Sequence, residues 1–134
     1  MKKQIQRVLV VDDDDLIRET VTAALEDDGY IVTEARDGAA ALNILYACSE
    51  PMVILLDLRM PKLDGAEVLA AVAADHRLAK QNAFILVTAD NKTITLTFAH
   101  LLAQLEVPVL KKPFDLDELL DLVADAAGRL DAVS

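Results

Sequence analysis

The sequence has a single cysteine, Cys48, and no hydrophobic run that approaches the ~20 residues needed to cross a bilayer. One cysteine excludes an internal disulfide and favours a reducing compartment, and its place late in an apolar, helix-like stretch indicates a packing role. The basic start, Met1 to Lys3, precedes an apolar run, Val8 to Val11, that is too short for a secretory signal. We therefore expect a cytoplasmic protein that does not associate with membranes.

The sequence is also poor in basic residues, with 13 Lys and Arg against 23 Asp and Glu, and its net charge is −10 at pH 7. Phosphate backbones attract clustered Lys and Arg, so this balance argues against direct nucleic-acid binding by the chain. The acidic balance instead permits the binding of cations.

Hydrophobic residues make up 54% of the 134 residues, which is enough for one folded domain with a proper core. No internal repeat, low-complexity tract or linker divides the sequence. We expect a single domain over residues 1–134, with a core of about residues 7–129.

Five strand-like runs alternate with five helical stripes along the chain, which is the pattern of an α/β fold with a doubly wound, five-stranded parallel sheet. The strands are expected at residues 7–11, 31–35, 53–57, 83–87 and 107–110. The helices are expected at residues 16–25, 39–47, 66–74, 92–106 and from 116 onward.

Charge and proline decide the expected order of the strands. The apolar parts of the first, third and fourth runs are free of charge, as in strands buried on both faces of a sheet. The second run contains Thr33 and Glu34, and the fifth contains Pro108, which cannot donate to a ladder, so both suit the edges. Strand order 2-1-3-4-5 with right-handed crossovers meets these conditions.

Four of the expected strands deliver a polar side chain at their carboxyl ends, where open parallel sheets bind ligands. These side chains are Asp12 and Asp13, Asp57, Thr88 and Lys112. Because the first and third strands should lie about 4.8 Å apart, their carboxylates are forced together and raise one another's pKa unless a cation is present. Oxygen ligands of this kind suit Mg²⁺.

The chemistry that this set of side chains favours is phosphoryl transfer to a carboxylate. An aspartate is a competent nucleophile for that transfer. The metal and Lys112 would neutralise charge on the phosphoryl oxygens, and positioning would supply most of the rest.

Four motifs stand in order along the chain, and together they are more specific than any one alone. They are Val10–Asp14, Leu56–Pro61 with Asp64–Gly65, Thr88–Ala89, and Lys112–Phe114. With these motifs, the chain from about Arg7 to Arg129 resembles the CheY-like receiver domains of two-component response regulators. The resemblance implies a phosphorelay receiver, a signalling domain that promotes its own aspartyl phosphorylation and dephosphorylation and is not otherwise an enzyme.

The resemblance also implies a role for each site residue. Asp57 would be the phosphoacceptor, Thr88 would contact the phosphoryl oxygen, and Lys112 would pair with it before a cis bond to Pro113. The ligands of Mg²⁺ would be Asp12, Asp13, Asp57 and the backbone carbonyl of Arg59. The phosphoryl donor would be a phosphohistidine on a histidine kinase or a histidine phosphotransfer protein.

Two stretches depart from the family pattern. Val109 stands where the family usually has an aromatic ring whose rotamer couples to the hydroxyl on the fourth strand, and a valine cannot swing as a ring does. Between Lys92 and Glu106 the only ionisable residue is His100, and Leu96 falls opposite the apolar stripe, roughly 200° from Ile94. We expect the face of residues 92–112 to bind a downstream protein partner or a second copy of the chain.

Three other functions share parts of this sequence pattern. A receiver-like scaffold that is not phosphorylated is the main alternative, and Val109 keeps it open. A flavodoxin-like cofactor binder is disfavoured because the aspartates after the first strand would repel a flavin phosphate. A phosphatase similar to haloacid dehalogenases would need a second aspartate where Arg59 stands. His76 and His100 lack metal-ligand spacing, and we interpret both as non-functional. The sequence leaves open whether this is a stand-alone receiver or part of a longer protein.

Overall fold

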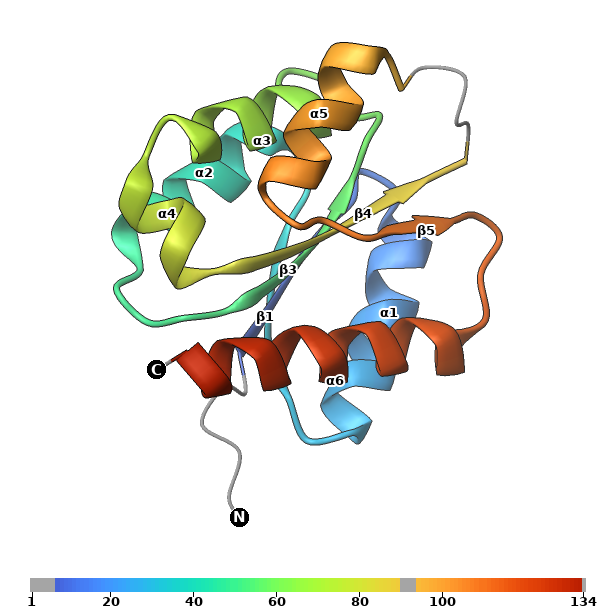
Figure 1. Cartoon of the computed structure of the whole chain (residues 1–134). Coiled ribbons are helices and arrows are strands. Elements are labelled where there is room, and N and C mark those ends of the chain that lie inside the picture. Colours follow the sequence, from blue (N-terminus) through green and yellow to red (C-terminus); the bar gives the residue numbers. More distant parts are fainter. Residues whose placement is uncertain (1–6, 90–93, 134) are drawn as a thin grey trace.

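The computed structural model describes residues 7–89 and 94–133, and their centre is a five-stranded parallel sheet of order β2-β1-β3-β4-β5 (Figure 1). The strands are β1 (Arg7–Val11), β2 (Ile31–Ala35), β3 (Val53–Asp57), β4 (Ala83–Thr88) and β5 (Val109–Lys111). The predicted fold class, number of strands and strand order are confirmed.

Helices cover both faces of the sheet, with α2 to α5 on one side and α1 and α6 on the other (Figure 1). The helices are α1 (Asp15–Asp27), α2 (Gly38–Ala47), α3 (Gly65–Ala73), α4 (His76–Gln81), α5 (Leu96–Gln104) and α6 (Leu116–Val133). Alternate strand residues point to opposite faces, so Leu9 and Ile54 join the core under α2 to α5, whereas Val8 and Val53 join the core under α1 and α6. No helix within the described ranges is long and apolar enough to span a membrane.

Burial along the strands explains their order. Every residue of β3 is buried, whereas β2 exposes Ile31, Thr33 and Glu34 at the sheet edge. At the other edge, Pro108 lacks an N–H but its carbonyl still accepts a hydrogen bond from Leu86 N–H at 2.9 Å. Charge-free runs therefore occupy the centre because a strand buried on both faces has no place for an unpaired charge.

The expected number of helices is wrong by one, because α4 was not predicted. Asp75 caps this six-residue helix by accepting a hydrogen bond from Leu78 N–H, and Leu78 is fully buried. Such a helix is shorter than the window over which a 3.6-residue period becomes visible in a sequence, and only one of its side chains is buried.

Several predicted boundaries also differ from the structure by one to four residues, and those of α5 and β5 are among them. The helix expected from Lys92 begins at Leu96, where Thr95 caps it by accepting a hydrogen bond from Phe98 N–H; positions 92 and 93 lie outside the described residues. The fifth strand, expected at residues 107–110, is Val109–Lys111. The exposed position predicted for Leu96 is confirmed.

Candidate functional site

The predicted polar side chains lie along one edge of the sheet. Asp12 and Asp13 follow β1, Asp57 ends β3, Thr88 ends β4, and Lys112 follows β5. The chain leaves β1 and β3 toward opposite faces of the sheet, since α1 and α3 cover different faces. Ligands of open α/β sheets bind where neighbouring strands lead to opposite faces, so the fold predicts a binding site at this edge.

Three carboxylates meet at the centre of this edge. Asp12, Asp13 and Asp57 each offer an oxygen, and these oxygens all lie within 4.8 Å of one another. Asp12 and Asp57 are only 5% and 6% exposed, whereas Asp13 is exposed. The cluster is thus buried on the side of Asp12 and Asp57 and open to solvent on the side of Asp13, so a metal ion bound there could keep part of its water shell.

Neighbouring backbone groups hold the loop after β1 in its shape. Asp12 N–H donates to the Ala35 carbonyl at 3.1 Å, which continues the pairing of β1 with β2. One carboxylate oxygen of Asp12 accepts from Asp14 N–H at 2.9 Å, and the Asp14 side chain accepts from Ile17 N–H as the cap of α1. Asp14 and Asp12 therefore differ in role, since Asp14 caps a helix and the second oxygen of Asp12 contacts Lys112.

Lys112 is the cation that faces the carboxylates. Its Nζ lies 3.2 Å from Asp12 Oδ2 and 3.3 Å from Asp57 Oδ1. Lys112 N–H donates to the Thr88 carbonyl at 2.8 Å, and its peptide bond to Pro113 is cis, as the family resemblance implies. The ammonium group is therefore fixed beside both carboxylates, with the end of β4 as its support.

Burial and like charge shape the electrostatics of the site. Burial, together with the Asp12 carboxylate, raises the pKa of Asp57 to about 6, against the opposing effect of Lys112. Burial alone would lower the pKa of Lys112, but the charges of Asp57 and Asp12 outweigh it and raise that pKa. A group of buried carboxylates with one ammonium is short of positive charge, and a divalent cation would supply it.

The donor set fits Mg²⁺ better than a softer metal. All three clustered ligands are carboxylate oxygens, and hard cations prefer such ligands. The described residues place no cysteine or histidine in a metal-holding cluster. Asp12, Asp13 and Asp57 are therefore the residues that could hold Mg²⁺ here.

The loop after β3 returns close to Asp57. Leu58 N–H donates to the Val87 carbonyl, and Gly65 N–H donates to the Leu58 carbonyl at 2.8 Å. A Cβ on Gly65 would lie 2.7 Å from the Asp57 carbonyl oxygen, so only glycine fits without a shift. The sequence marked Gly65 as a turn residue and part of a motif, but it gave no sign of this close approach. Arg59, between them, is exposed.

Thr88 on β4 and Val109 on β5 differ in exposure. Thr88 is only 1% exposed at the end of β4, where Lys111 is its partner on β5. Val109 is 40% exposed on the edge strand. The two residues lie on neighbouring strands, and the aromatic ring that the family usually carries at the edge position is replaced here by an open, apolar surface.

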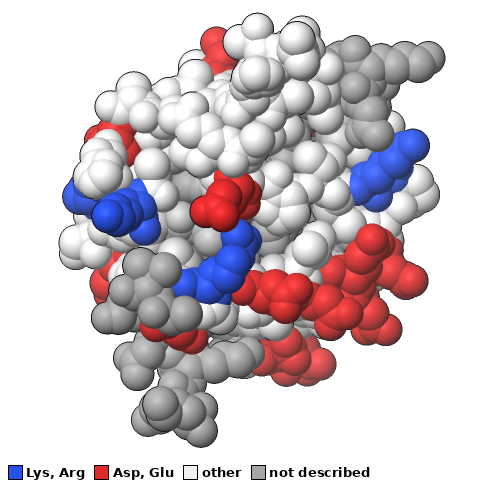
Figure 2. Space-filling view, viewed as in Figure 1, with Lys and Arg blue, Asp and Glu red and all other residues white. Residues whose placement is uncertain are grey.

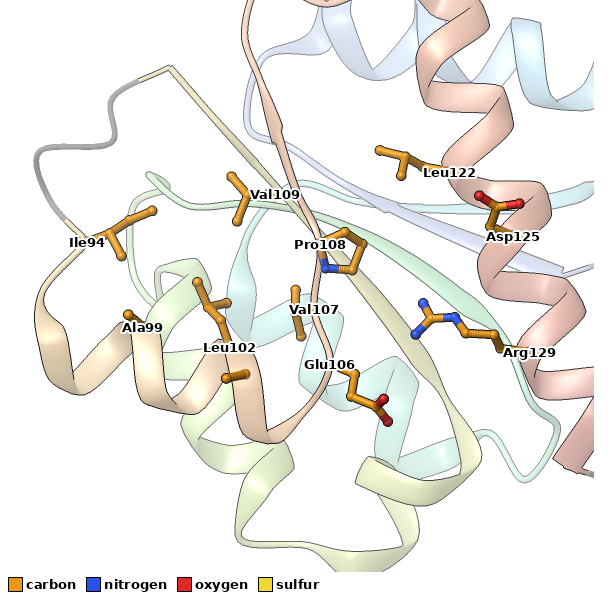
Figure 3. A pocket seen from close by; sticks show the side chains of 11 residues that line it. Ile94, Ala99, Leu102, Glu106, Val107, Pro108, Val109, Leu122, Asp125 and Arg129 are labelled. Atoms are coloured by element: carbon orange, nitrogen blue, oxygen red, sulfur yellow. The ribbon is translucent and has the colours of Figure 1, made fainter.

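That surface forms a pocket between α5 and α6 (Figure 3). The pocket is lined chiefly by apolar side chains, and its charged lining residues are Glu106, Asp125 and Arg129. In Figure 3 the segment from Val107 to Val109 runs between Leu102 on α5 and Leu122 on α6. The pocket therefore belongs to the 92–112 face that the sequence marked as a binding surface.

Comparison with known proteins gives consistent matches. The family model described as "Response regulator receiver domain" matches residues 8–124. The protein "Response regulator MprA" of Mycobacterium sp. (strain KMS) is 39% identical over 114 residues, which is 85% of this chain and 47% of that protein. The chain thus spans about half the length of the curated relatives it matches.

Solved structures agree with this match. A CheY-like response regulator receiver domain protein from Methanospirillum hungatei JF-1 has a TM-score of 0.76 at 28% identity, covering 92% of this chain and 95% of that one. A response regulator receiver protein from Pseudomonas putida has a TM-score of 0.74 at 29% identity, covering 92% and 99%.

Proposed function

Because the chain belongs to the response regulator receiver domain family, we propose that it accepts a phosphoryl group on Asp57 from a phosphohistidine of a partner protein. The donor is a histidine kinase or a histidine phosphotransfer protein. The chain acts as one receiver domain in the cytoplasm, and phosphorylation changes its binding to a downstream protein. Family membership itself shows that the chain is a signalling domain of the two-component type.

One observation carries the proposal: Asp57 lies between two carboxylates and one ammonium group at the switch point of the sheet. An oxygen of the ionised Asp57 carboxylate attacks phosphorus, and the bond between phosphorus and the donor imidazole nitrogen breaks. The bonding electron pair leaves with that nitrogen. With a pKa of about 6, Asp57 is mostly ionised at neutral pH and can act as the nucleophile.

The residues around Asp57 supply charge and position. Mg²⁺, held by Asp12, Asp13, Asp57 and the backbone carbonyl of Arg59, would neutralise negative charge on the phosphoryl oxygens. Lys112 already contacts Asp57 Oδ1, so its ammonium group is in reach of a phosphoryl oxygen added there. The hydroxyl of Thr88, at the end of the next strand, binds another of these oxygens.

Acetyl phosphate tests the acceptor without knowledge of the natural donor. The chain is incubated with acetyl phosphate with and without Mg²⁺, and its intact mass is measured. We expect a gain of one phosphoryl group that depends on Mg²⁺ and is lost in Asp57→Asn. A scaffold that is not phosphorylated would show no gain with any competent small donor, and that result would replace the receiver proposal.

The downstream partner binds the pocket of Figure 3 and the exposed Leu96 beside it, and its chemistry follows from charge. Helix α5 contains no Asp, Glu, Lys or Arg. Asp125 of α6 lines the pocket, and Figure 2 shows acidic side chains gathered over the N-terminal half of this helix. The exposed acids of α6 are Asp117, Glu118, Asp121 and Asp125. The matching occupant is an amphipathic segment of another protein with apolar residues on one side and Lys or Arg beside them.

A second copy of the chain fits this face less well. In a symmetric dimer through this pocket, each copy would bring two acids, Glu106 and Asp125, and one cation, Arg129, and α5 adds no further cation. A homodimer therefore stands as the competing outcome of the test.

Two model peptides distinguish the occupants. They share one leucine stripe, and one carries Lys and the other Glu at the flanking positions. We expect the Lys peptide to perturb the NMR signals of Val109 and Leu122, and Leu96→Asp or Asp125→Lys to weaken this effect. Equal binding of both peptides, or self-association of the free chain that Leu96→Asp abolishes, would contradict the assignment.

A further inference from the structure

Arg18 of α1 is a buried cation next to the site that the acceptor chemistry does not use. Only 8% of the residue is exposed. Its guanidinium donates three hydrogen bonds: Nη1 to the Asp12 carbonyl at 2.8 Å, Nε to Glu34 Oε1 at 2.9 Å, and Nη2 to Asp15 Oδ1 at 2.6 Å. The three acceptors belong to the loop after β1, the edge strand β2 and the first turn of α1.

The bond to the Asp12 carbonyl completes the fixation of this residue. Asp12 N–H is held by the Ala35 carbonyl, and one carboxylate oxygen is held by Asp14 N–H. With Arg18 on the carbonyl, both main-chain polar groups of Asp12 are fixed, and so is the plane of the peptide bond that leads to Asp13. The directions in which the Asp12 and Asp13 carboxylates point therefore depend on the guanidinium.

The geometry of the guanidinium explains why an arginine stands here. Its planar fork serves three acceptors at once, which the ammonium group of a lysine does with less geometric definition. Glu34 and Asp15 balance its charge on the outer side, with side chains 39% and 72% exposed. The hydrogen bond that Arg18 donates to Asp15 helps to keep the guanidinium charged, since it raises the pKa of Arg18. The Nη1 group of Arg18 therefore donates to an uncharged group, the Asp12 carbonyl in the loop after β1.

We propose that Arg18, aligned by Glu34, is a positioning residue that sets the affinity of the carboxylate cluster for Mg²⁺ through the Asp12 carbonyl. This inference rests on the proposed metal-dependent function of the same site. Residues that orient the ligands of a metal typically change its affinity 10–100-fold when removed, although they touch neither the metal nor its substrate. Arg18 has that relation to Asp12.

The direct measurement is the Mg²⁺ dissociation constant of the whole chain, obtained by NMR titration with MgCl₂ and no phosphoryl donor. We expect Arg18→Met to raise the dissociation constant about ten-fold. Arg18→Lys, which keeps the charge but not the fork, should fall between this variant and the wild type. Glu34→Ala, on the edge strand, should weaken Mg²⁺ binding several-fold because Arg18 loses its alignment.

Arg77 offers a matched control at another part of the fold. Its guanidinium also donates to backbone carbonyls, those of Cys48, Leu45 and Tyr46 at the end of α2. Arg77→Met should lower the free energy of unfolding without changing the Mg²⁺ dissociation constant. A general loss of stability would therefore affect both arginine variants, whereas a positioning role would separate them.

Three results would overturn the positioning role of Arg18. A dissociation constant within two-fold of the wild type in a folded Arg18 variant overturns the positioning role. If neither Arg18 variant folds, Glu34→Ala decides, and an unchanged dissociation constant there overturns it equally. If the wild-type chain itself binds no Mg²⁺, the proposed metal site fails before this inference is reached.

Discussion

At the scale of single residues, the site is defined by a carboxylate that the fold makes costly to ionise. Asp57 is buried beside Asp12, and Lys112 offsets only part of the cost. The ordinary pKa of 3.8 therefore rises to about 6 in the folded chain. A group whose folded pKa is raised contributes stability at low pH, and this contribution is lost as pH rises through the folded value. Ionised Asp57 thus lowers the free energy of unfolding, and a bound cation can offset this loss.

Asp57→Asn should stabilise the metal-free chain at neutral pH. The rise of the pKa from 3.8 to about 6 corresponds to a gain of about 2–3 kcal/mol in the free energy of unfolding at pH 7.5. The gain should be smaller by roughly 2 kcal/mol at pH 4.5, because Asp57 of the wild type then carries a proton in the folded state. Urea unfolding with EDTA at both pH values measures this difference.

An exposed aspartate provides the comparison for that experiment. Asp125 lies exposed on α6, so Asp125→Asn should change stability by less than about 0.5 kcal/mol at either pH. If Asp57→Asn behaves like Asp125→Asn, the burial of the Asp57 carboxylate does not destabilise the folded state.

At the scale of elements, the site depends on how closely the start of α3 returns to the end of β3. Asp64 and Glu67 form a capping box at the start of α3, which fixes where the helix begins. Gly65 then passes against the Asp57 carbonyl. Asp57 is therefore held from both sides, by its strand and by the helix that follows.

Gly65→Ala should destabilise the chain although alanine is the better helix former. The added Cβ would lie 2.7 Å from the Asp57 carbonyl oxygen, and the backbone around Asp57 would have to shift. We expect a loss of roughly 1–3 kcal/mol in the free energy of unfolding and weaker Mg²⁺ binding. Thermal and urea unfolding, with an Mg²⁺ titration, provide the measurements.

Gly128 on α6 is the control, because nothing lies within 4 Å of a Cβ added there. Gly128→Ala should stabilise the chain by about 0.5–1 kcal/mol through helix propensity. Equal effects of the two substitutions would show that the approach of Gly65 to Asp57 has no consequence.

The elements also show what the sequence could predict. Charge-free runs identified β1, β3 and β4 as central, because complete burial leaves a local mark on composition. The positions of the polar side chains at the strand ends followed from that order. The short helix α4 and the start of α5 at Leu96 left no such mark, since one buried residue and a threonine cap decide them.

The finer contacts of the site were outside the reach of the sequence. The approach of Gly65 to Asp57 and the bond from Arg18 to Asp12 join segments whose spacing is set by packing. Residue types give no measure of such distances. The sequence therefore predicted which side chains meet, but not which neighbours hold them in place.

At the scale of the whole molecule, a net charge of −10 favours the binding of a divalent cation. Binding to the native state alone should raise the free energy of unfolding by about 1.4 kcal/mol at a Mg²⁺ concentration ten times the dissociation constant. Thermal melts with and without MgCl₂ measure this shift. Asp13→Ala should abolish most of it, since Asp13 is one of three clustered carboxylates.

Ionic strength has to be matched in that experiment, because salt alone screens repulsion within an acidic chain. A melt in NaCl of equal ionic strength supplies the baseline. A shift that NaCl reproduces, or one that survives in Asp13→Ala, would assign the effect to screening and not to a bound ion.

The most direct test of phosphoryl transfer to Asp57 is the position of the phosphoryl group on the chain. The chain is phosphorylated with acetyl phosphate and Mg²⁺, reduced with borohydride, which converts an acyl phosphate of aspartate to homoserine, and mapped by peptide mass spectrometry. We expect homoserine at position 57 only, with Asp12 and Asp13 unmodified. Modification at another aspartate or at His76 or His100, with Asp57 unmodified, would contradict it.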